Sequence, residues 1–254
     1  MTKRTGTCAF AAALLLAAAA PALAAPVAYP GSIWMNTSRD FSGLEGTGIQ
    51  GRLQQGVDFV RVPGGAVLGA FGGWGGRSRS LNQQYFDEDG PYLGLSVRGR
   101  WLEIGADGGW QRYPLLHRTD RVFTPFATWY YGKDLRPAGS RFGLPLATWG
   151  RVEYGANTVG GAGSMGWVQQ GIEWVTLPRG VKLETFGEYA WRLRDKNRTY
   201  YDVRGPGLGI RLTLPAASLG VERVWQDYPE LGTRTQSVRL FFNLYQAWDL
   251  KPKH

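Results

Sequence analysis

Apolar and polar side chains alternate with a period of two along this sequence, and this pattern limits the folds open to it. The clearest case is the segment 181–192, in which Leu183 and Tyr189 alternate with Glu184 and Glu188. Successive side chains of a β-strand point to opposite faces, so one face of this segment is apolar and the other is charged. Such a strand suits a barrel wall between lipid and a polar interior.

Similar segments recur along the chain, separated by turns rich in glycine and proline. We expect strands at about 31–39, 49–59, 66–76, 92–98, 101–111, 122–131, 146–156, 165–177, 181–192, 205–213, 217–226 and 238–245. The even number is typical of bacterial outer-membrane barrels. The sequence therefore predicts an all-β fold, an antiparallel transmembrane outer-membrane β-barrel of about 12 strands.

The N-terminus is typical of a secretory signal peptide. Lys3 and Arg4 precede an apolar stretch at 10–20, and Ala22-Leu23-Ala24 forms a small-residue cleavage site. The apolar stretch is too short to cross a bilayer as a helix. We expect residues 1–24 to be removed and residues 25–254 to form the barrel in the cell outer membrane of a Gram-negative envelope.

Composition narrows the chemistry. Cys8 is the only cysteine and lies in the signal peptide, so the mature chain offers no disulfide or cysteine metal site. The formal net charge of +9 comes mostly from arginine. In an exported protein, arginine is expected to pair with acids in the lumen or to face lipopolysaccharide or an acidic polymer. We expect outer-membrane lipids and lipopolysaccharide as partners, no nucleic acid, no cofactor and no metal.

The polar faces of the predicted strands carry many charges, which this register points into the lumen. The predicted charge network consists of Arg151, Glu153, Glu173, Glu184, Glu188, Arg211, Glu222 and Arg239. Buried charges must pair or remain hydrated. The network is therefore expected to brace the barrel wall; the alternative is a narrow, porin-like hydrophilic pathway whose charges select a solute.

Aromatic residues also fall on the inward side in this register. Because aromatic faces stack on sugar rings, Trp101, Trp167, Phe186 and Tyr245 are candidates for glycan stacking. The alternative is that these side chains simply fill space in the lumen.

Signals for catalysis are weak. His117 is the only histidine besides the last residue, His254. A nucleophilic site would have to bring His117 to a serine such as Ser78 or Ser80 and to an acid such as Asp87. We predict no catalytic residue.

The connections are alternately short and long, as expected for periplasmic turns and external loops. Examples of short connections are 63–65 and 178–180, and examples of long ones are 77–90 and 193–203. The exception is 132–145, a long segment on the periplasmic side, which is expected to fold into the barrel mouth, contact a partner or form an irregular turn. No internal repeat of fixed period is expected.

Several motifs in the second half of the chain resemble one group of barrels. They are Gly-Arg-Val-Glu-Tyr-Gly at 150–155, Gly-Glu-Tyr at 187–189, Gly-Pro-Gly-Leu-Gly-Ile-Arg-Leu at 205–212, Phe-Phe-Asn-Leu-Tyr at 241–245 and Trp-Asp-Leu at 248–250. This part, less than half of the chain, is similar to the C-terminal barrel of the bacteriophage adsorption protein A family, whose members accompany exopolysaccharide synthesis and secretion. That family's periplasmic helical repeats are absent here, so the resemblance implies a separate periplasmic scaffold and contact with polysaccharide-synthesis machinery.

These observations lead to an expected function. We expect a non-enzymatic outer-membrane barrel that supports export of exopolysaccharide or another envelope polymer. One alternative is an outer-membrane enzyme acting on lipid or lipopolysaccharide. The other is a structural or solute-channel barrel that serves as a phage receptor.

Overall fold

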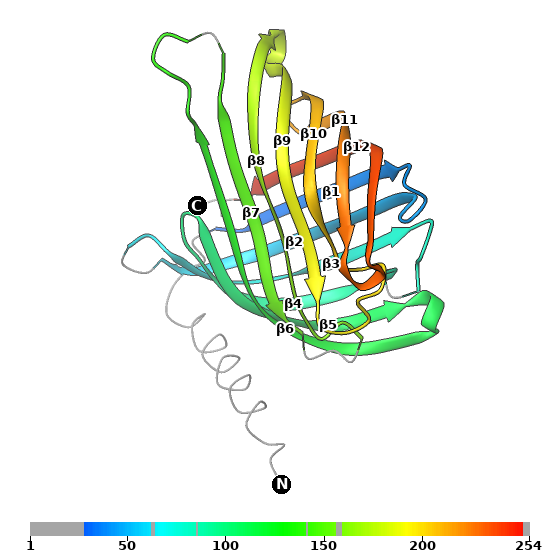
Figure 1. The fold of residues 1–254 in the computed structure, drawn as a ribbon. Coiled ribbons are helices and arrows are strands. Elements are labelled where there is room, and N and C mark those ends of the chain that lie inside the picture. The colour runs from blue at the N-terminus through cyan, green and yellow to red at the C-terminus, as the bar shows by residue number, and fades with distance from the viewer. Residues whose placement is uncertain (1–27, 62–63, 85, 141, 156–158, 251–254) are drawn as a thin grey trace.

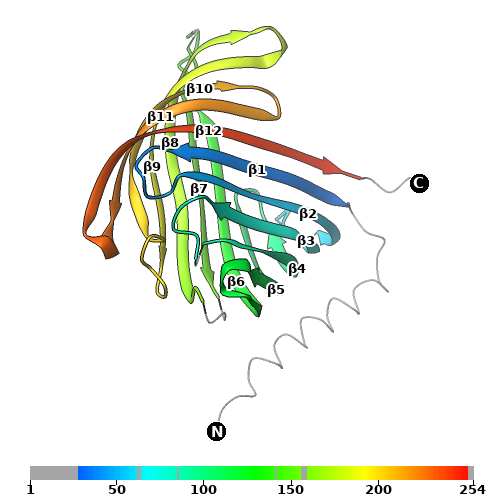
Figure 2. The same ribbon diagram turned by 90° about the vertical axis from the view of Figure 1, so that its right-hand side faces the viewer.

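The computed structural model describes residues 28–61, 64–84, 86–140, 142–155 and 159–250. Twelve strands form one closed antiparallel barrel, in which each strand pairs with its neighbours in sequence and β12 pairs with β1 (Figures 1 and 2). The strands are β1 (Pro30–Asp40), β2 (Thr47–Arg61), β3 (Val67–Arg79), β4 (Glu88–Arg98), β5 (Leu102–Tyr113), β6 (Arg118–Asp134), β7 (Pro145–Tyr154), β8 (Ala162–Leu177), β9 (Val181–Arg194), β10 (Val203–Thr213), β11 (Ala217–Tyr228) and β12 (Thr233–Asp249). The predicted fold is confirmed, whereas the predicted signal peptide lies outside the described residues.

The alternation seen in the sequence becomes the two faces of the barrel wall. Leu93 and Leu208 are exposed on the outside, at 67% and 58%, while Glu184 and Glu222 are buried in the lumen. Apolar exposure of this kind is favourable against lipid, as expected of a protein in the outer membrane. Among the described residues, no helix is long and apolar enough to cross a membrane.

The barrel consists of two related halves, which we call the first repeat (β1 to β6) and the second repeat (β7 to β12). Each residue of the first repeat corresponds to the residue 115 positions later in the chain. The strands of the two repeats match in order, and β4, β5 and β6 have the same bounds as β10, β11 and β12 after this shift. Identical pairs include Trp34/Trp149, Gln54/Gln169, Phe71/Phe186, Arg77/Arg192, Arg79/Arg194, Asn82/Asn197, Pro91/Pro206, Trp110/Trp225, Tyr113/Tyr228 and Phe126/Phe241.

The hydrogen-bond register repeats as well. Ser38 of β1 lies opposite Phe241 of β12, and Glu153 of β7 lies opposite Phe126 of β6. Phe241 is the counterpart of Phe126 and Ser38 is the counterpart of Glu153, so the two seams between repeats are equivalent. In Figure 1, β2 to β5 cross the view while β8 to β11 run up it, so the two repeats form facing halves of the wall.

Local irregularities are duplicated too. Both β2 and β8 change register near the periplasmic end, between Asp58 and Val60 and between Glu173 and Val175. The expectation of no fixed-period repeat is therefore wrong. The identical residues are scattered glycines, aromatics and turn residues, separated by side chains that have diverged, so no continuous motif marks the repeat.

The duplication explains the long periplasmic segment. The loop at 135–144 joins the two repeats, whereas the other periplasmic connections are hairpin turns within a repeat. The Leu135 N–H donates to the Leu144 carbonyl (2.8 Å), and the Leu250 N–H donates to the Tyr29 carbonyl (3.1 Å) in the equivalent place. At one seam, the loop at 135–144 connects the last strand of the first repeat to the first strand of the second. At the other seam, the equivalent place lies between Leu250 and Tyr29, near the two ends of the described chain.

Equivalent seams predict that the order of the repeats is exchangeable. A permuted chain would begin at Leu144, continue from Leu250 to Tyr29 through a copy of residues 136–143, and end at Leu135. Behind a signal peptide, this chain is expected to insert and to show the heat-modifiable gel migration of the parent barrel. A chain permuted in the middle of β9 is the control and should not assemble; failure of both would contradict the equivalence of the seams.

One turn position differs between repeats in a way that predicts a change in stability. His117 and Gly232 both have left-handed backbone, with φ of 47° and 58°. Left-handed backbone costs a residue with a Cβ roughly 1–2 kcal/mol, part of which is offset by glycine's greater freedom in the unfolded chain. His117→Gly is therefore expected to stabilise the barrel by about 0.5 kcal/mol in urea unfolding from lipid vesicles. His117→Ala, which keeps the Cβ, should give no such gain.

Candidate functional site

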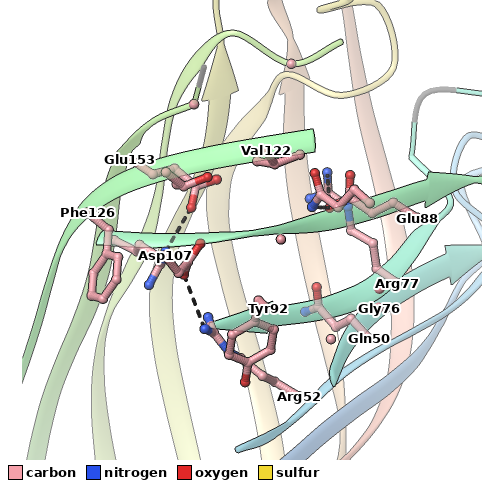
Figure 3. Close-up of a pocket in the computed structure, with 18 of the residues that line it drawn as sticks. Gln50, Arg52, Gly76, Arg77, Glu88, Tyr92, Asp107, Val122, Phe126 and Glu153 are labelled. Atoms are coloured by element: carbon pink, nitrogen blue, oxygen red, sulfur yellow. Dashed lines mark hydrogen bonds and ion pairs between the residues drawn. The ribbon is translucent and has the colours of Figure 1, made fainter. Parts of the chain in front are cut away.

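The inside of the barrel holds a cavity of about 390 Å³ beside the first repeat, which we call the lumen cavity (Figure 3). Its size lies at the lower end of the usual range for small-molecule sites. Its lining combines charged, amide and aromatic side chains. Among the lining residues are Trp34, Gln50, Arg52, Tyr92, Asp107, Phe126, Trp149, Arg151 and Glu153.

An ionic bridge crosses the lumen at this cavity. The Asp107 Oδ2 atom on β5 lies 3.3 Å from the Arg52 Nη2 atom on β2 and 3.3 Å from the Arg151 Nη2 atom on β7. The Arg151 Nε atom also donates to Glu153 (2.8 Å). Side chains from strands far apart in the wall are thus held together by charge, in an interior where pairing is needed to offset lost hydration.

Both arginines are also stacked on aromatic rings. The Arg52 guanidinium carbon lies 3.8 Å from the centroid of the Tyr92 ring, and that of Arg151 lies 4.0 Å from the centroid of the Phe126 ring. Stacking leaves the edges of a guanidinium free to donate hydrogen bonds. The buried Arg52 Nε atom has no hydrogen-bond partner among the described residues.

The residues of the predicted charge network lie in three places: at the lumen cavity, inside the second repeat and at the periplasmic rim. Arg151 and Glu153 pair at the lumen cavity. In the second repeat, Arg211 donates to Glu184 (2.6 Å) and Arg239 donates to Glu222 (3.1 Å). These pairs connect neighbouring strands and brace the wall.

The other two predicted acids have different partners. Glu188 accepts a hydrogen bond from the Gln169 amide (3.2 Å), and Gln169 in turn accepts one from Arg211 (2.6 Å). Glu173 lies at the periplasmic rim, where it binds Lys182 (2.8 Å). The structure therefore does not bring all eight residues into one cluster.

The predicted glycan-stacking residues do not come together. Phe186 is buried and packs against Phe241, with ring centroids 5.9 Å apart. Trp101 and Tyr245 are more than half exposed near the periplasmic end, and Trp167 pairs across strands with Trp149. The aromatics that line the lumen cavity are Trp34, Tyr92, Phe126 and Trp149. Two of these, Trp34 and Trp149, are equivalent in the repeats, so comparison of the halves would have found them.

The inward positions of β3 and β9 carry different side chains in the two repeats. Gly69 and Gly73 of β3 correspond to Glu184 and Glu188 of β9, whose carboxylates project into the lumen. A Cβ on Gly73 would collide with the Leu53 carbonyl. In the first repeat, Asp58 and Tyr92 lie where these side chains would be, since a Cβ on Gly69 would meet the Asp58 carboxylate and one on Gly73 the Tyr92 hydroxyl, each at 2.8 Å.

A duplicated loop motif covers the external end of the barrel. Residues 77–87 and 192–202 share the pattern Arg-x-Arg-x-x-Asn-x-x-Tyr-Phe/Tyr-Asp. Each loop has the same internal bonds: the second arginine of the motif donates through Nε to the asparagine carbonyl, at 3.1 Å in the first and 3.0 Å in the second. We call these two loops together the clasp.

The two loops of the clasp interlock. Arg77 Nη1 donates to the Tyr201 hydroxyl (3.1 Å), and Arg79 Nη1 donates to the Tyr200 carbonyl (3.0 Å). In the other direction, the Arg192 guanidinium lies 5.0 Å from the centroid of the Phe86 ring. Each loop is therefore ordered by contacts with the other.

Glu45, from the loop between β1 and β2, completes the clasp. It lies 2.9 Å from Arg192 Nη2 and 3.6 Å from Arg79 Nη1. Burial alone would raise the pKa of Glu45, but the charges of Arg192, Arg239 and Arg79 outweigh burial and hold its pKa below the ordinary value. Glu45 is thus a carboxylate that helps to hold the external end closed.

The catalytic arrangement considered for the loops is not formed. Ser78 Oγ donates to Asp87 (2.9 Å), and Ser80 Oγ accepts from the Thr47 N–H (2.9 Å). Within the described residues, no hydrogen bond links His117 to Ser78, Ser80 or Asp87. Within the described part of the chain, no three histidine, cysteine, aspartate or glutamate residues gather as metal ligands would.

Comparisons with known proteins find only distant similarities. No protein-family model and no curated protein matches the chain. Among solved structures, LpxR from Salmonella typhimurium is 11% identical over 84% of this chain and 99% of its own, with a TM-score of 0.40. A bacterial polysaccharide outer membrane secretin is 10% identical over 89% and 100%, with a TM-score of 0.41. An outer membrane channel from Pseudomonas putida F1 is 12% identical over 89% and 97%, with a TM-score of 0.40.

The fold is established by the closed twelve-stranded barrel itself, and these similarities add nothing narrower. The resemblance to the bacteriophage adsorption protein A family is not found among them. The prediction that the chain is not an enzyme is wrong. The comparison contradicts it, because LpxR, an outer-membrane lipid A deacylase, is among the similar structures. The barrel fold therefore does not exclude enzymatic activity.

The lowered pKa of Glu45 predicts pH-dependent stability. A carboxyl with a lowered folded-state pKa stabilises the fold above its ordinary pKa, and this contribution is lost as the pH falls through the lowered value. Glu45→Gln is expected to destabilise the barrel by about 2 kcal/mol at neutral pH, and by less at about pH 3, in urea unfolding.

The control is Glu230→Gln, which removes an external-loop carboxylate paired with the exposed Arg198. Exposed pairs contribute little, so this variant should match the parent at both pH values. An equal loss for both variants at neutral pH would contradict a specific role of Glu45 in the clasp.

Proposed function

We propose that this protein supports export of an exopolysaccharide or another envelope polymer through the outer membrane, and that the polymer contacts the lumen cavity. The observation that carries the proposal is the lining of this cavity, in which paired arginines and carboxylates lie beside Trp34, Tyr92 and Trp149. Hydrogen-bonding groups and aromatic rings at close quarters suit a hydrated sugar chain. An acyl chain would require an apolar lining instead.

The clasp bears on how such a polymer would pass. Its two loops are ordered by contacts with each other across the external end of the barrel. Passage therefore requires the clasp loops to separate. Lipopolysaccharide would surround the barrel at this end, where the arginine-rich loops lie.

The proposal includes a separate periplasmic scaffold linked to the polysaccharide-synthesis machinery. Its docking site would be the loop at 135–144. Phe142 packs edge to face on Trp174, with centroids 5.8 Å apart, and both rings remain about half exposed. Arg136 is held against Glu173 (3.5 Å), so the loop offers an ordered surface at the periplasmic rim.

Deletion of the gene is expected to reduce surface polysaccharide at least severalfold, with restoration by the parent protein. Gly75→Leu should not restore it, because Gly75 lines the cavity and a Cβ here makes only ordinary contacts, 3.7 Å from the Tyr92 ring and 3.8 Å from the Gly51 carbonyl, so that the leucine would fill the cavity. Gly108→Leu, the same change on the lipid face, is the control and should restore it.

The measurement is the amount of surface polysaccharide, together with the acylation pattern of lipid A. Normal polysaccharide in the deletion strain, accompanied by altered lipid A acylation, would reject export and favour an enzyme acting on lipid. Equal restoration by both glycine variants would reject a role for the lumen cavity.

A further inference from the structure

The two repeats provide an internal comparison for assigning roles to residues. Positions that are identical in both halves serve the fold that the halves share. Inward positions that differ, and that gather around the lumen cavity, serve a role that only one half has. This comparison needs no other sequence, because the offset of 115 positions places each residue beside its counterpart.

The positions around the lumen cavity fall into both classes. Asp107 has an acidic counterpart in Glu222, so an inward acid belongs to the shared design. Arg52, by contrast, corresponds to Trp167, and Tyr92 corresponds to Gly207. The stacked pair of Arg52 and Tyr92 therefore exists in the first repeat alone.

The other arginine of the cavity shows the same divergence. Arg151 of β7 corresponds to Asn36 of β1, and Glu153 corresponds to Ser38. The cavity thus brings together residues that the duplicated fold does not require. We call this set the divergent cluster; it consists of Arg52, Tyr92, Arg151 and Glu153, held around Asp107.

Bracing of the wall does not account for the divergent cluster. The second repeat is braced without such a cavity, by Arg239 bound to Glu222 and, across the seam, to Asp40 (3.6 Å). Buried ion pairs are in general weak contributors to stability. The first repeat instead keeps its ion pairs beside the open space of the lumen cavity, where a ligand can reach their side chains.

The charge of the cluster indicates the class of ligand. Two guanidinium groups face two carboxylates, those of Asp107 and Glu153, so the cluster is neutral as it stands. An anionic sugar would compete with Asp107 for both arginines and leave a carboxylate unpaired, at a high cost in the lumen. A neutral sugar leaves both ion pairs intact and uses the edges of the stacked guanidiniums.

We propose that the divergent cluster is a binding site for an uncharged sugar unit, which contacts the stacked guanidinium of Arg52 at the lumen cavity. This inference deepens the proposed function, on which its choice of ligand rests. Trp34 and Trp149 also line the cavity and would report binding through their fluorescence.

The test is a fluorescence titration of the purified, full-length barrel with uncharged tetrasaccharides of glucose, galactose and N-acetylglucosamine, and with tetragalacturonate as the acidic probe. At least one uncharged probe is expected to give a saturable change. Arg52→Gln and Arg52→Lys should each weaken it at least tenfold; the lysine variant keeps the charge opposite Asp107 but lacks the planar guanidinium that stacks on Tyr92. Arg112→Gln, at an exposed arginine outside the cavity, should bind as the parent does.

Heat-modifiable migration of each variant shows that its barrel is folded. Tighter binding of tetragalacturonate than of every uncharged probe, or unchanged binding in both Arg52 variants, would overturn the assignment. Absence of binding to all probes would overturn it as well, while reduced polysaccharide in the deletion strain would leave the export function standing. Binding that depends on Arg52, with normal polysaccharide in the deletion strain, would uphold the site and reject export.

Discussion

The structure depends on the need to pair every backbone N–H and C=O group inside a membrane that offers no water. A sheet meets this need only by closing on itself, because an open edge would leave a row of unpaired groups in lipid. Here closure is reached with two copies of one six-stranded unit. Each copy has two edges, and the seams at β6–β7 and β12–β1 have the same register.

Once the wall is closed, the alternation of side chains decides what the interior contains. Every second residue points inward, so a lumen of this size is filled or left open by the choice at a small number of positions. Where the second repeat carries Glu184 and Glu188, the first carries Gly69 and Gly73, and Asp58 and Tyr92 lie against these glycines instead. Duplication thus supplied a stable wall in two parts and allowed one part to acquire a polar cavity.

The fold could be predicted from the sequence because the period of two is a local property. Segments such as 181–192 show their apolar and charged faces without any knowledge of their neighbours. The lumen cavity could not be predicted in this way, since Arg52, Asp107 and Arg151 meet across the interior from three strands. The aromatic candidates failed for the same reason: an inward register does not distinguish a ring that packs in the wall, such as Phe186, from one that lines open space.

The interlocking of the clasp makes the external ends of the two repeats energetically dependent on each other. Displacing the loop at 195–202 removes the Tyr201 hydroxyl from Arg77 and the Tyr200 carbonyl from Arg79, and these two arginines also pack on Phe86 of the other loop. Coupling of this kind is reciprocal, and a molecule that binds one loop in its displaced form favours displacement of the other by the same free energy. Contact with only one of the two loops is therefore felt by the other.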